Sequence, residues 1–245
     1  MIIDPNFDFR SEIKSGQDPD SHSPSLRRFH AFLWSKPLPT AADLKLRIDK
    51  PKQYLAATVG AVDMTLSSDA IAHSFLTTKA LEKIVAGVEA KRKQAILSRL
   101  RTVGGYIVFP ANRVDGKMTI NGARGCNNRI CDRFDLTLEC IRRHYYKEES
   151  PLAEVLSRYR FFFDLFVNFR GYVEFFLLQD LVQEEAIQFF LPFDGKFSAR
   201  PFPRDLAEYE CYVSNVMNFV TLRGRRMREW CEGGQTPDSS RVRAE

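Results

Sequence analysis

The sequence lacks any run of about 18 apolar residues, so we expect no membrane-spanning helix. Its first segment, MIIDPNFDFRSEIKSGQDPD, is acidic and has no apolar stretch, which argues against a secretory signal peptide. Both absences point to a cytoplasmic protein, and this location is our expectation from the sequence.

Cysteine is sparse and irregularly placed. The five cysteines are odd in number and form no C-x-x-C pair, which is not typical of a disulfide framework or a structural zinc site. They are Cys126, Cys131, Cys140, Cys211 and Cys231. We therefore expect free thiols.

Common catalytic and nucleotide-binding motifs are also missing. Neither G-x-G-x-x-G nor G-x-x-x-x-G-K-[ST] occurs in the chain. None of the four histidines accompanies a serine or cysteine in a recognisable nucleophile motif. A functional site must therefore be sought in less familiar combinations of residues.

The composition itself is that of a globular protein. With 245 residues, 44% of them hydrophobic, the chain can bury a large core, and its length suits a single domain. Most of the 20 phenylalanines follow residue 130, which predicts that the C-terminal half holds the main core.

Positive charge is concentrated in one part of the chain. Residues 91–133 carry ten basic side chains against two acidic ones, a net charge of +8. Residues 175–210 carry seven acids against three bases, a net charge of −4. This asymmetry predicts either an anionic partner or pairing between the two segments, within one chain or in a homo-oligomer.

Hydrophobic periodicity and capping residues predict the secondary structure. We expect helices over residues 24–34, 78–101, 128–145 and 205–222, strands over 43–48, 106–110 and 117–120, and a strand running into a helix over 64–75. These elements predict an α+β fold, a mostly helical single domain with a small antiparallel sheet. We place the globular domain at residues 23–230, after an irregular N-terminal lead-in (1–22) and before a disordered tail (231–245).

The segment TINGARGCNNRICDRFDLTLECIRRHY, residues 119–145, holds the best candidate site. We expect a loop between a strand ending near Ile120 and a helix beginning near Asn127 or Asn128. Glycines in this loop would let the backbone approach a phosphate closely. The N–H groups at the helix N-terminus and a bidentate arginine side chain would then bind the phosphate oxygens. The candidate phosphate-binding or nucleic-acid-binding residues are Arg113, Lys117, Asn121, Gly122, Arg124, Gly125, Arg129 and Arg133. The alternative is an ordinary loop with surface arginines.

An acidic stripe follows this loop. Asp132, Asp135 and Glu139 stand three and four residues apart, on one face of the expected helix. Carboxylates in this arrangement can hold Mg²⁺ or Mn²⁺ beside a phosphate, as a metal-dependent hydrolase would require. The alternative is a salt-bridged surface, because Glu139 and Arg143 are four residues apart and Asp132 has arginines on both sides.

A further basic motif, RGRRMR, occupies residues 223–228 at the end of the last expected helix. Four arginines in six residues suit a nucleic-acid backbone. They also suit the C-terminus of a helix for purely structural reasons.

Several long strings resemble a known family. SLRRFHAFLWSKPLP, GGYIVFP followed by GKMTINGARG, and DRFDLTLECIRRHY through RGYVEFFLLQDLV are similar to a bacterial family of about this length that is known only as a domain of unknown function. The resemblance covers most of residues 7–225. It implies one domain and a bacterial or phage origin, and it brings no activity, cofactor or catalytic residue.

Three functions remain open at this point. The first is binding of nucleic acid or a nucleotide phosphate through the basic strand-loop-helix segment. The second is a metal-dependent phosphoester or nucleotide hydrolase that uses the acidic stripe with Mg²⁺ or Mn²⁺. The third is a non-catalytic protein-interaction module. The sequence alone does not decide whether the protein is an enzyme.

Overall fold

The computed structural model describes residues 3–40, 44–49, 54–59, 62–71 and 73–233. Its helices are η1 (Phe9–Glu12), α1 (Pro19–His22), α2 (Pro24–Trp34), η2 (Lys79–Leu81), α3 (Glu82–Ala86), α4 (Ala90–Leu100), η3 (Val103–Gly105), α5 (Ile120–Cys126), α6 (Phe134–Tyr146), α7 (Ala153–Arg158), α8 (Arg160–Phe163), η4 (Asp164–Phe166), α9 (Phe169–Phe175) and α10 (Leu206–Gly233). Its strands are β1 (Lys45–Asp49), β2 (Tyr54–Val59), β3 (Val62–Ala70), β4 (Tyr106–Pro110), β5 (Val182–Gln183) and β6 (Ala186–Ile187). The prediction of a mostly helical α+β domain with a small antiparallel sheet is confirmed.

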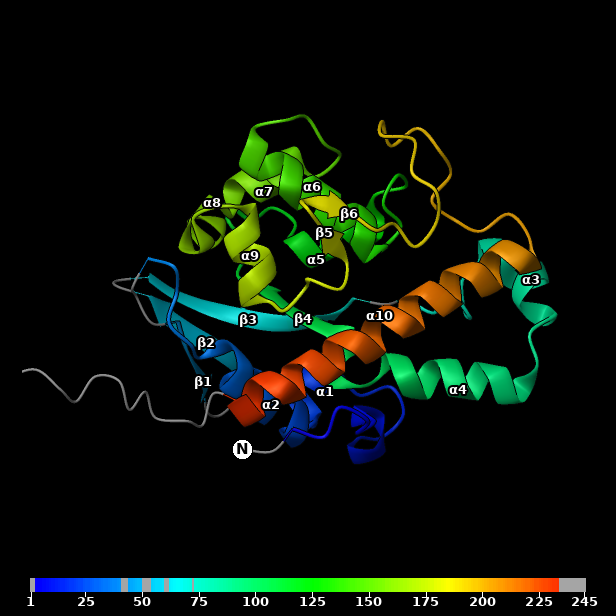
Figure 1. Cartoon of the computed structure of the whole chain (residues 1–245). Coiled ribbons are helices and arrows are strands. Elements are labelled where there is room, and N and C mark those ends of the chain that lie inside the picture. Colours follow the sequence, from blue (N-terminus) through cyan, green and yellow to red (C-terminus); the bar gives the residue numbers. More distant parts are fainter. Residues whose placement is uncertain (1–2, 41–43, 50–53, 60–61, 72, 234–245) are drawn as a thin grey trace, which may run out of the picture.

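The main sheet lies between two groups of helices. Figure 1 shows α5 to α9 on one side of the sheet and α1, α2 and α10 on the other. The long helix α10 runs beside α4 and contacts it along the molecule (Figure 1). Across the described ranges, every helix is too short or too polar to span a lipid bilayer.

The four-stranded sheet has the simple order β1-β2-β3-β4, with every neighbouring pair antiparallel. Leu46 of β1 lies opposite Ala57 of β2, and Ala57 lies opposite Met64 of β3, so these three buried side chains form one row. Strand β3 continues to Ala70 and pairs with the buried strand β4. The expected change from strand to helix within residues 64–75 is therefore wrong.

Local capping explains the best-predicted helix. Ser23 precedes Pro24, and the Ser23 hydroxyl accepts a hydrogen bond from the Leu26 N–H at 3.1 Å. A proline at the first helical position needs no N–H partner. Helix α2 consequently begins and ends where the sequence predicts. The strands predicted over 43–48 and 106–110 are confirmed as β1 and β4.

Other expected elements differ in extent. The single helix expected over 78–101 is divided into η2, α3 and α4, with Gly87 following α3. Residues 117–120 form no strand, and Asp115 and Gly116 make a turn at φ values of 52° and 69°. The helix expected from residue 128 begins only at Phe134, and α10 continues eleven residues beyond the expected end at 222.

The two ends of the chain contribute more than expected. Ile3 and Phe9 are buried in the main core, so the described part of the lead-in, residues 3–22, packs onto the domain. Residues 231–233 of the expected tail still belong to α10. The remaining tail, 234–245, lies outside the described residues.

One hydrophobic core includes residues from both halves of the chain, from Ile3 to Cys231. The phenylalanine-rich segment contributes a cluster of ring contacts in which Phe166, Tyr172 and Phe176 lie 4.9–5.3 Å apart between centroids. Aromatic pairs at such distances add to the hydrophobic stabilisation. The C-terminal half therefore supplies much of the core, and the N-terminal segments complete it.

A fully buried arginine ties α10 to the rest of the fold. The Arg223 guanidinium donates to the carbonyl oxygens of Gly104 at 2.9 Å, Tyr106 at 2.7 Å and Phe176 at 3.0 Å. Burial lowers the pKa of Arg223 to about 9. Helix α10 approaches η3 closely, because a Cβ atom on Gly104 would lie 2.3 Å from the Val220 carbonyl oxygen.

We expect Arg223→Met to lower the free energy of unfolding by about 3 kcal/mol or more, because three buried carbonyl groups lose their donor. Urea unfolding followed by circular dichroism measures this change. Arg225→Met, at an exposed position on the same helix, serves as the matched control and should change stability by less than about 0.5 kcal/mol. Equal effects of the two substitutions would contradict the structural role of Arg223.

Candidate functional site

The segment expected to be a phosphate-binding loop is mostly helical. Residues 120–126 form α5, which Thr119 caps by accepting a hydrogen bond from the Gly122 N–H at 3.3 Å. Gly122 and Gly125 are therefore helical residues, and the expected backbone cradle between a strand and a helix is wrong. The chain then reverses through Cys131 and Asp132, whose φ values of 47° and 64° are unusual for residues other than glycine.

Arg124 points inward from α5 and is completely buried. Its guanidinium forms an ion pair with Asp69 at the end of β3, and it lies 3.4 Å from the Asp132 carboxylate. It also donates to the carbonyl oxygen of Ala70 and to the Thr137 hydroxyl, both at 3.2 Å. Arg124 thus joins β3, α5 and α6 internally, and its guanidinium is buried away from the surface where an external phosphate would bind.

Two residues of this charged cluster carry no recognisable signal in the sequence. Asp69 and His73 lie in the segment 64–75, where the sequence predicts a change from strand to helix and contains no catalytic motif. Burial lowers the pKa of His73, and the nearby Asp132 and Asp69 carboxylates partly oppose this shift. The His73 Nδ1 atom accepts the Phe75 N–H at 3.0 Å, which leaves a neutral ring protonated on Nε2. Long-range strand pairing, invisible in the sequence, brings these groups to Arg124.

The second buried arginine of the segment, Arg133, pairs with Asp135 of α6. The two side chains are 2% and 0% exposed and meet at 2.5 Å. Arg133 also donates to the carbonyl oxygens of Leu191 at 3.3 Å and Pro201 at 3.0 Å, and the Asp135 carboxylate accepts the Phe190 N–H at 2.9 Å. This pair fastens both ends of the segment 190–201.

The third carboxylate of the acidic stripe supports the same segment less directly. Glu139 accepts hydrogen bonds from Arg142 at 2.9 Å and from Arg143 at 2.7 Å. Arg143 then donates to the Gly195 carbonyl oxygen at 2.5 Å, and its guanidinium lies 4.9 Å from the centroid of the Phe197 ring. The predicted ion pair between Glu139 and Arg143 is confirmed.

A carboxylate inside the segment 190–201 organises its turn. Asp194 accepts hydrogen bonds from the N–H groups of Lys196 at 2.9 Å, Ser198 at 3.0 Å and Ala199 at 2.8 Å, and from the Ser198 hydroxyl. These donors lower the pKa of Asp194 to about 2. These donors keep the Asp194 carboxylate ionised, and they order the turn that contains Lys196, Ser198 and Ala199.

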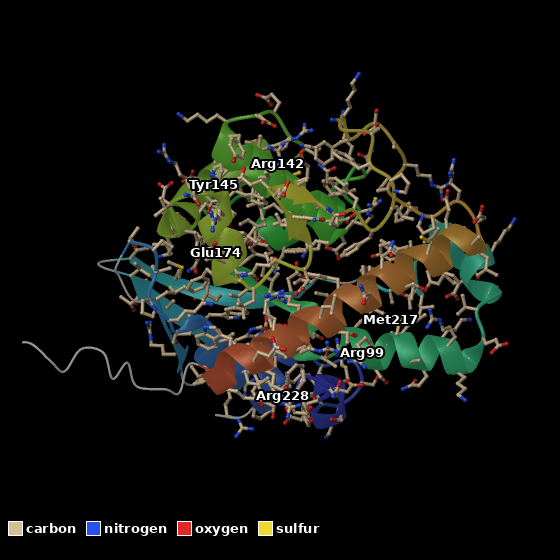
Figure 2. The ribbon with its side chains drawn as sticks, viewed as in Figure 1. Arg99, Arg142, Tyr145, Glu174, Met217 and Arg228 are labelled. Atoms are coloured by element: carbon tan, nitrogen blue, oxygen red, sulfur yellow. The ribbon has the colours of Figure 1, made fainter. Side chains whose placement is uncertain are left out.

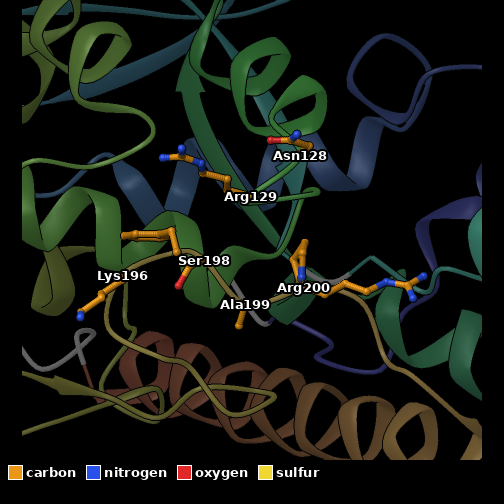
Figure 3. Close-up of a pocket in the computed structure, with 8 residues that line it drawn as sticks. Asn128, Arg129, Lys196, Ser198, Ala199 and Arg200 are labelled. Atoms are coloured by element: carbon orange, nitrogen blue, oxygen red, sulfur yellow. The ribbon is translucent and has the colours of Figure 1, made fainter.

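The fastened segment forms one wall of a surface pocket of about 430 Å³, which we call the cationic pocket. Its lining residues are Asn128, Arg129, Lys196, Phe197, Ser198, Ala199, Arg200 and Pro201. Three of them are cationic and none is acidic. Within the described part of the chain, neither Arg129 nor Lys196 has a side-chain hydrogen bond or ion pair. Figure 3 shows Asn128 and Arg129 across the pocket from the 196–200 segment, with the Arg200 side chain directed away from Arg129.

Only Arg129 among the eight predicted phosphate-binding residues lines this pocket. Arg113 and Lys117 are exposed elsewhere, and Lys117 pairs with Glu154 at 3.3 Å. The Asn121 amide donates to the Ser67 hydroxyl at 2.9 Å, which ties α5 to β3. Lys196 and Arg200 were not expected at the site, because both belong to the segment with a net charge of −4.

Three of the four arginines of the RGRRMR motif have structural partners, and the fourth, Arg225, is exposed. Arg223 is buried, Arg226 pairs with Asp180 at 2.8 Å, and Arg228 pairs with Glu232 at 2.9 Å. Figure 2 shows Arg228 near the end of α10. These internal pairs favour the structural alternative for this motif.

Metal binding by the acidic stripe has little geometric support. Asp135 and Glu139 are buried or nearly so, and arginines already engage their carboxylate oxygens. Among all residues whose placement is described, no group of three or more His, Cys, Asp or Glu side chains is arranged to hold a metal ion. Asp135 accepts the Phe190 N–H, Glu139 holds Arg143, and Asp132 lies beside Arg124.

The fold and site define a mostly helical α+β domain that presents a cationic surface pocket. Residues 3–227 match a family of unknown function, DUF6994, and the chain belongs to this family. No curated protein and no solved structure matches the chain.

We expect Gly125→Ala to raise the free energy of unfolding by about 0.5–1 kcal/mol, because Gly125 is an exposed helical residue with nothing within 4 Å of an added Cβ atom. Gly116→Ala is the matched control. It also has open space, but its φ of 69° disfavours alanine, so this substitution should destabilise the protein. Thermal unfolding of both variants measures the difference. A destabilised Gly125→Ala variant would contradict the helical assignment.

The pKa of Asp194 leads to a second prediction. Its value of about 2 in the folded protein lies below the ordinary 3.8, so its stabilising effect is present above about pH 4 and is lost as the pH falls through about 2. In an NMR titration, the amide shifts of Lys196, Ser198 and Ala199 should remain nearly constant between pH 6 and pH 3. A titration step centred near pH 4 would show that these amides do not hold the ionised carboxylate.

Proposed function

We propose that the protein binds the phosphate groups of a nucleotide or a nucleic acid in the cationic pocket. The observation that carries this proposal is that Arg129 and Lys196, neither of which has a side-chain hydrogen bond or ion pair among the described residues, line one pocket without an acidic lining residue, with a third cation, Arg200, at its edge. Many arginines elsewhere along the described chain pair with carboxylates, whereas the Arg129 and Lys196 side chains have no such partner among the described residues and are available for an external anion.

The chemistry of these residues suits a phosphate. Arginine presents a planar fork of N–H donors that matches two phosphate oxygens, while lysine acts as a point charge. Asn128 and Ser198 add neutral polar groups to the same lining. A pocket of about 430 Å³ also lies within the range of about 300–1,000 Å³ that small-ligand sites occupy.

Hydrogen bonds to the segment 190–201 favour ligand binding, because they reduce the conformational entropy that this segment loses when a ligand binds. Arg133 and Arg143 hold the segment 190–201 through Leu191, Pro201 and Gly195. A loop that is ordered before the ligand arrives loses less conformational entropy on binding. Arg133 and Arg143 therefore contribute indirectly, by positioning Lys196 and Arg200.

We expect Arg129→Ala and Lys196→Ala each to weaken binding of a fluorescein-labelled oligonucleotide or a labelled nucleotide by about tenfold. Each substitution should also make the affinity less sensitive to salt, because fewer counterions are released on binding. Fluorescence anisotropy titrations over a series of salt concentrations measure both effects.

Arg113→Ala is the control for this experiment. Arg113 is exposed and belongs to the basic segment, but it does not line the pocket. Its loss should change the affinity by less than about twofold if the pocket binds the ligand, since an isolated surface charge contributes little. An equal loss of affinity in Arg113→Ala and Arg129→Ala would point to diffuse charge attraction, and no salt-sensitive binding by the unaltered protein would refute the proposal.

A further inference from the structure

A second, smaller pocket adjoins the cationic pocket and shares two of its lining residues. This second pocket has a volume of about 230 Å³, and we call it the apolar pocket. Its lining residues are Leu191, Pro192, Ala199, Arg200, Phe202, Arg204 and Glu208. Ala199 and Arg200 belong to both linings, so the two pockets lie on either side of these residues.

The apolar pocket differs from its neighbour in chemistry. Leu191, Pro192 and Phe202 give it apolar walls, and its acidic residue, Glu208, already accepts hydrogen bonds from Arg204 at 2.8 Å. The Arg200 guanidinium lies 5.9 Å from the centroid of the Phe202 ring. An aromatic ring beside a guanidinium plane is a surface on which a flat heterocycle can stack.

The orientation of Arg200 links the two pockets. In Figure 3 its side chain extends away from Arg129, and the contact with Phe202 places its guanidinium at the apolar pocket. The anionic part of a ligand would therefore meet Arg129 and Lys196, and a flat apolar part would meet Arg200 and Phe202. A ligand that fills both pockets must therefore connect its anionic part to its flat part across Ala199.

We propose that the ligand is a nucleotide, with its phosphates in the cationic pocket and its base in the apolar pocket against Phe202 and Arg200. This inference rests on the proposed function, because it assigns a ligand class to the same site. A nucleotide joins a flat heterocycle to an anionic phosphate through one sugar, which matches two small pockets that share a wall. A nucleic-acid strand would instead use a longer row of cations and stacking rings.

Isothermal titration calorimetry with matched probes tests this assignment. The probes are pyrophosphate, adenosine and the four common nucleoside diphosphates, with a short single-stranded oligonucleotide as the polymer. We expect at least one nucleoside diphosphate to bind ten times more tightly than pyrophosphate and more tightly than adenosine, since base stacking contributes about 1–3 kcal/mol.

Substitutions separate the two pockets. Phe202→Ala should weaken nucleoside diphosphate binding about tenfold and change pyrophosphate binding by less than twofold, because only the base loses its stacking partner. Arg129→Ala should weaken both ligands. Phe202 also contacts Phe75 in the interior, with ring centroids 5.4 Å apart, so Phe202→Leu provides a milder variant with the same expected selectivity if the alanine variant unfolds.

The outcomes distinguish this inference from the function on which it rests. Equal affinity for pyrophosphate and nucleoside diphosphates, with no effect of Phe202→Leu, would overturn the base site and leave phosphate binding in place. Tighter binding of the oligonucleotide than of every nucleoside diphosphate would also overturn it in favour of a polymer. No binding of any phosphate-containing probe would overturn both proposals.

Discussion

The buried pair of Arg133 and Asp135 holds the part of the structure on which the candidate site depends. Arg133 donates to the carbonyl oxygens of Leu191 and Pro201, and Asp135 accepts the Phe190 N–H. One guanidinium and one carboxylate at the start of α6 therefore satisfy backbone groups at both ends of the segment 190–201. Removing either partner would leave the other charge buried and unpaired, which is strongly destabilising.

Buried arginines join distant parts of the chain in the same way at two other places in the fold. Arg124 joins the end of β3 to the turn before α6, and Arg223 joins α10 to β4 and α9. A guanidinium suits this role because its five donors are spread over one rigid plane and can reach several acceptors at once. Much of the positive charge of the protein thus acts inside the molecule, where it cross-links elements that are distant in sequence.

Because several arginines are buried or paired within the protein, the positive charges at the surface differ from those that the sequence suggests. Of the ten cations in residues 91–133, Arg124 and Arg133 are buried and Arg92 and Lys117 are paired with carboxylates, so part of the net charge of +8 is used within the protein. Arg129, from the same window, lines the pocket together with Lys196 and Arg200. The turn between α5 and α6 is thus used twice, since Asn128 and Arg129 face the pocket and Asp132 faces Arg124.

The sequence by itself determined the fold class and the elements whose signals are local. Ser23 and Pro24 define the start of α2, and β1 and β4 appear where alternation and apolar runs predict them. It also predicted the pairing of Glu139 with Arg143, and it drew attention to residues 119–145, of which Asn128 and Arg129 line the pocket. Only the tertiary structure decided which charges point inward, because burial depends on partners far along the chain, such as Asp69 for Arg124 and Pro201 for Arg133. For the same reason the pocket combines Arg129 with Lys196 and Arg200, which local charge counting assigned to an acidic segment.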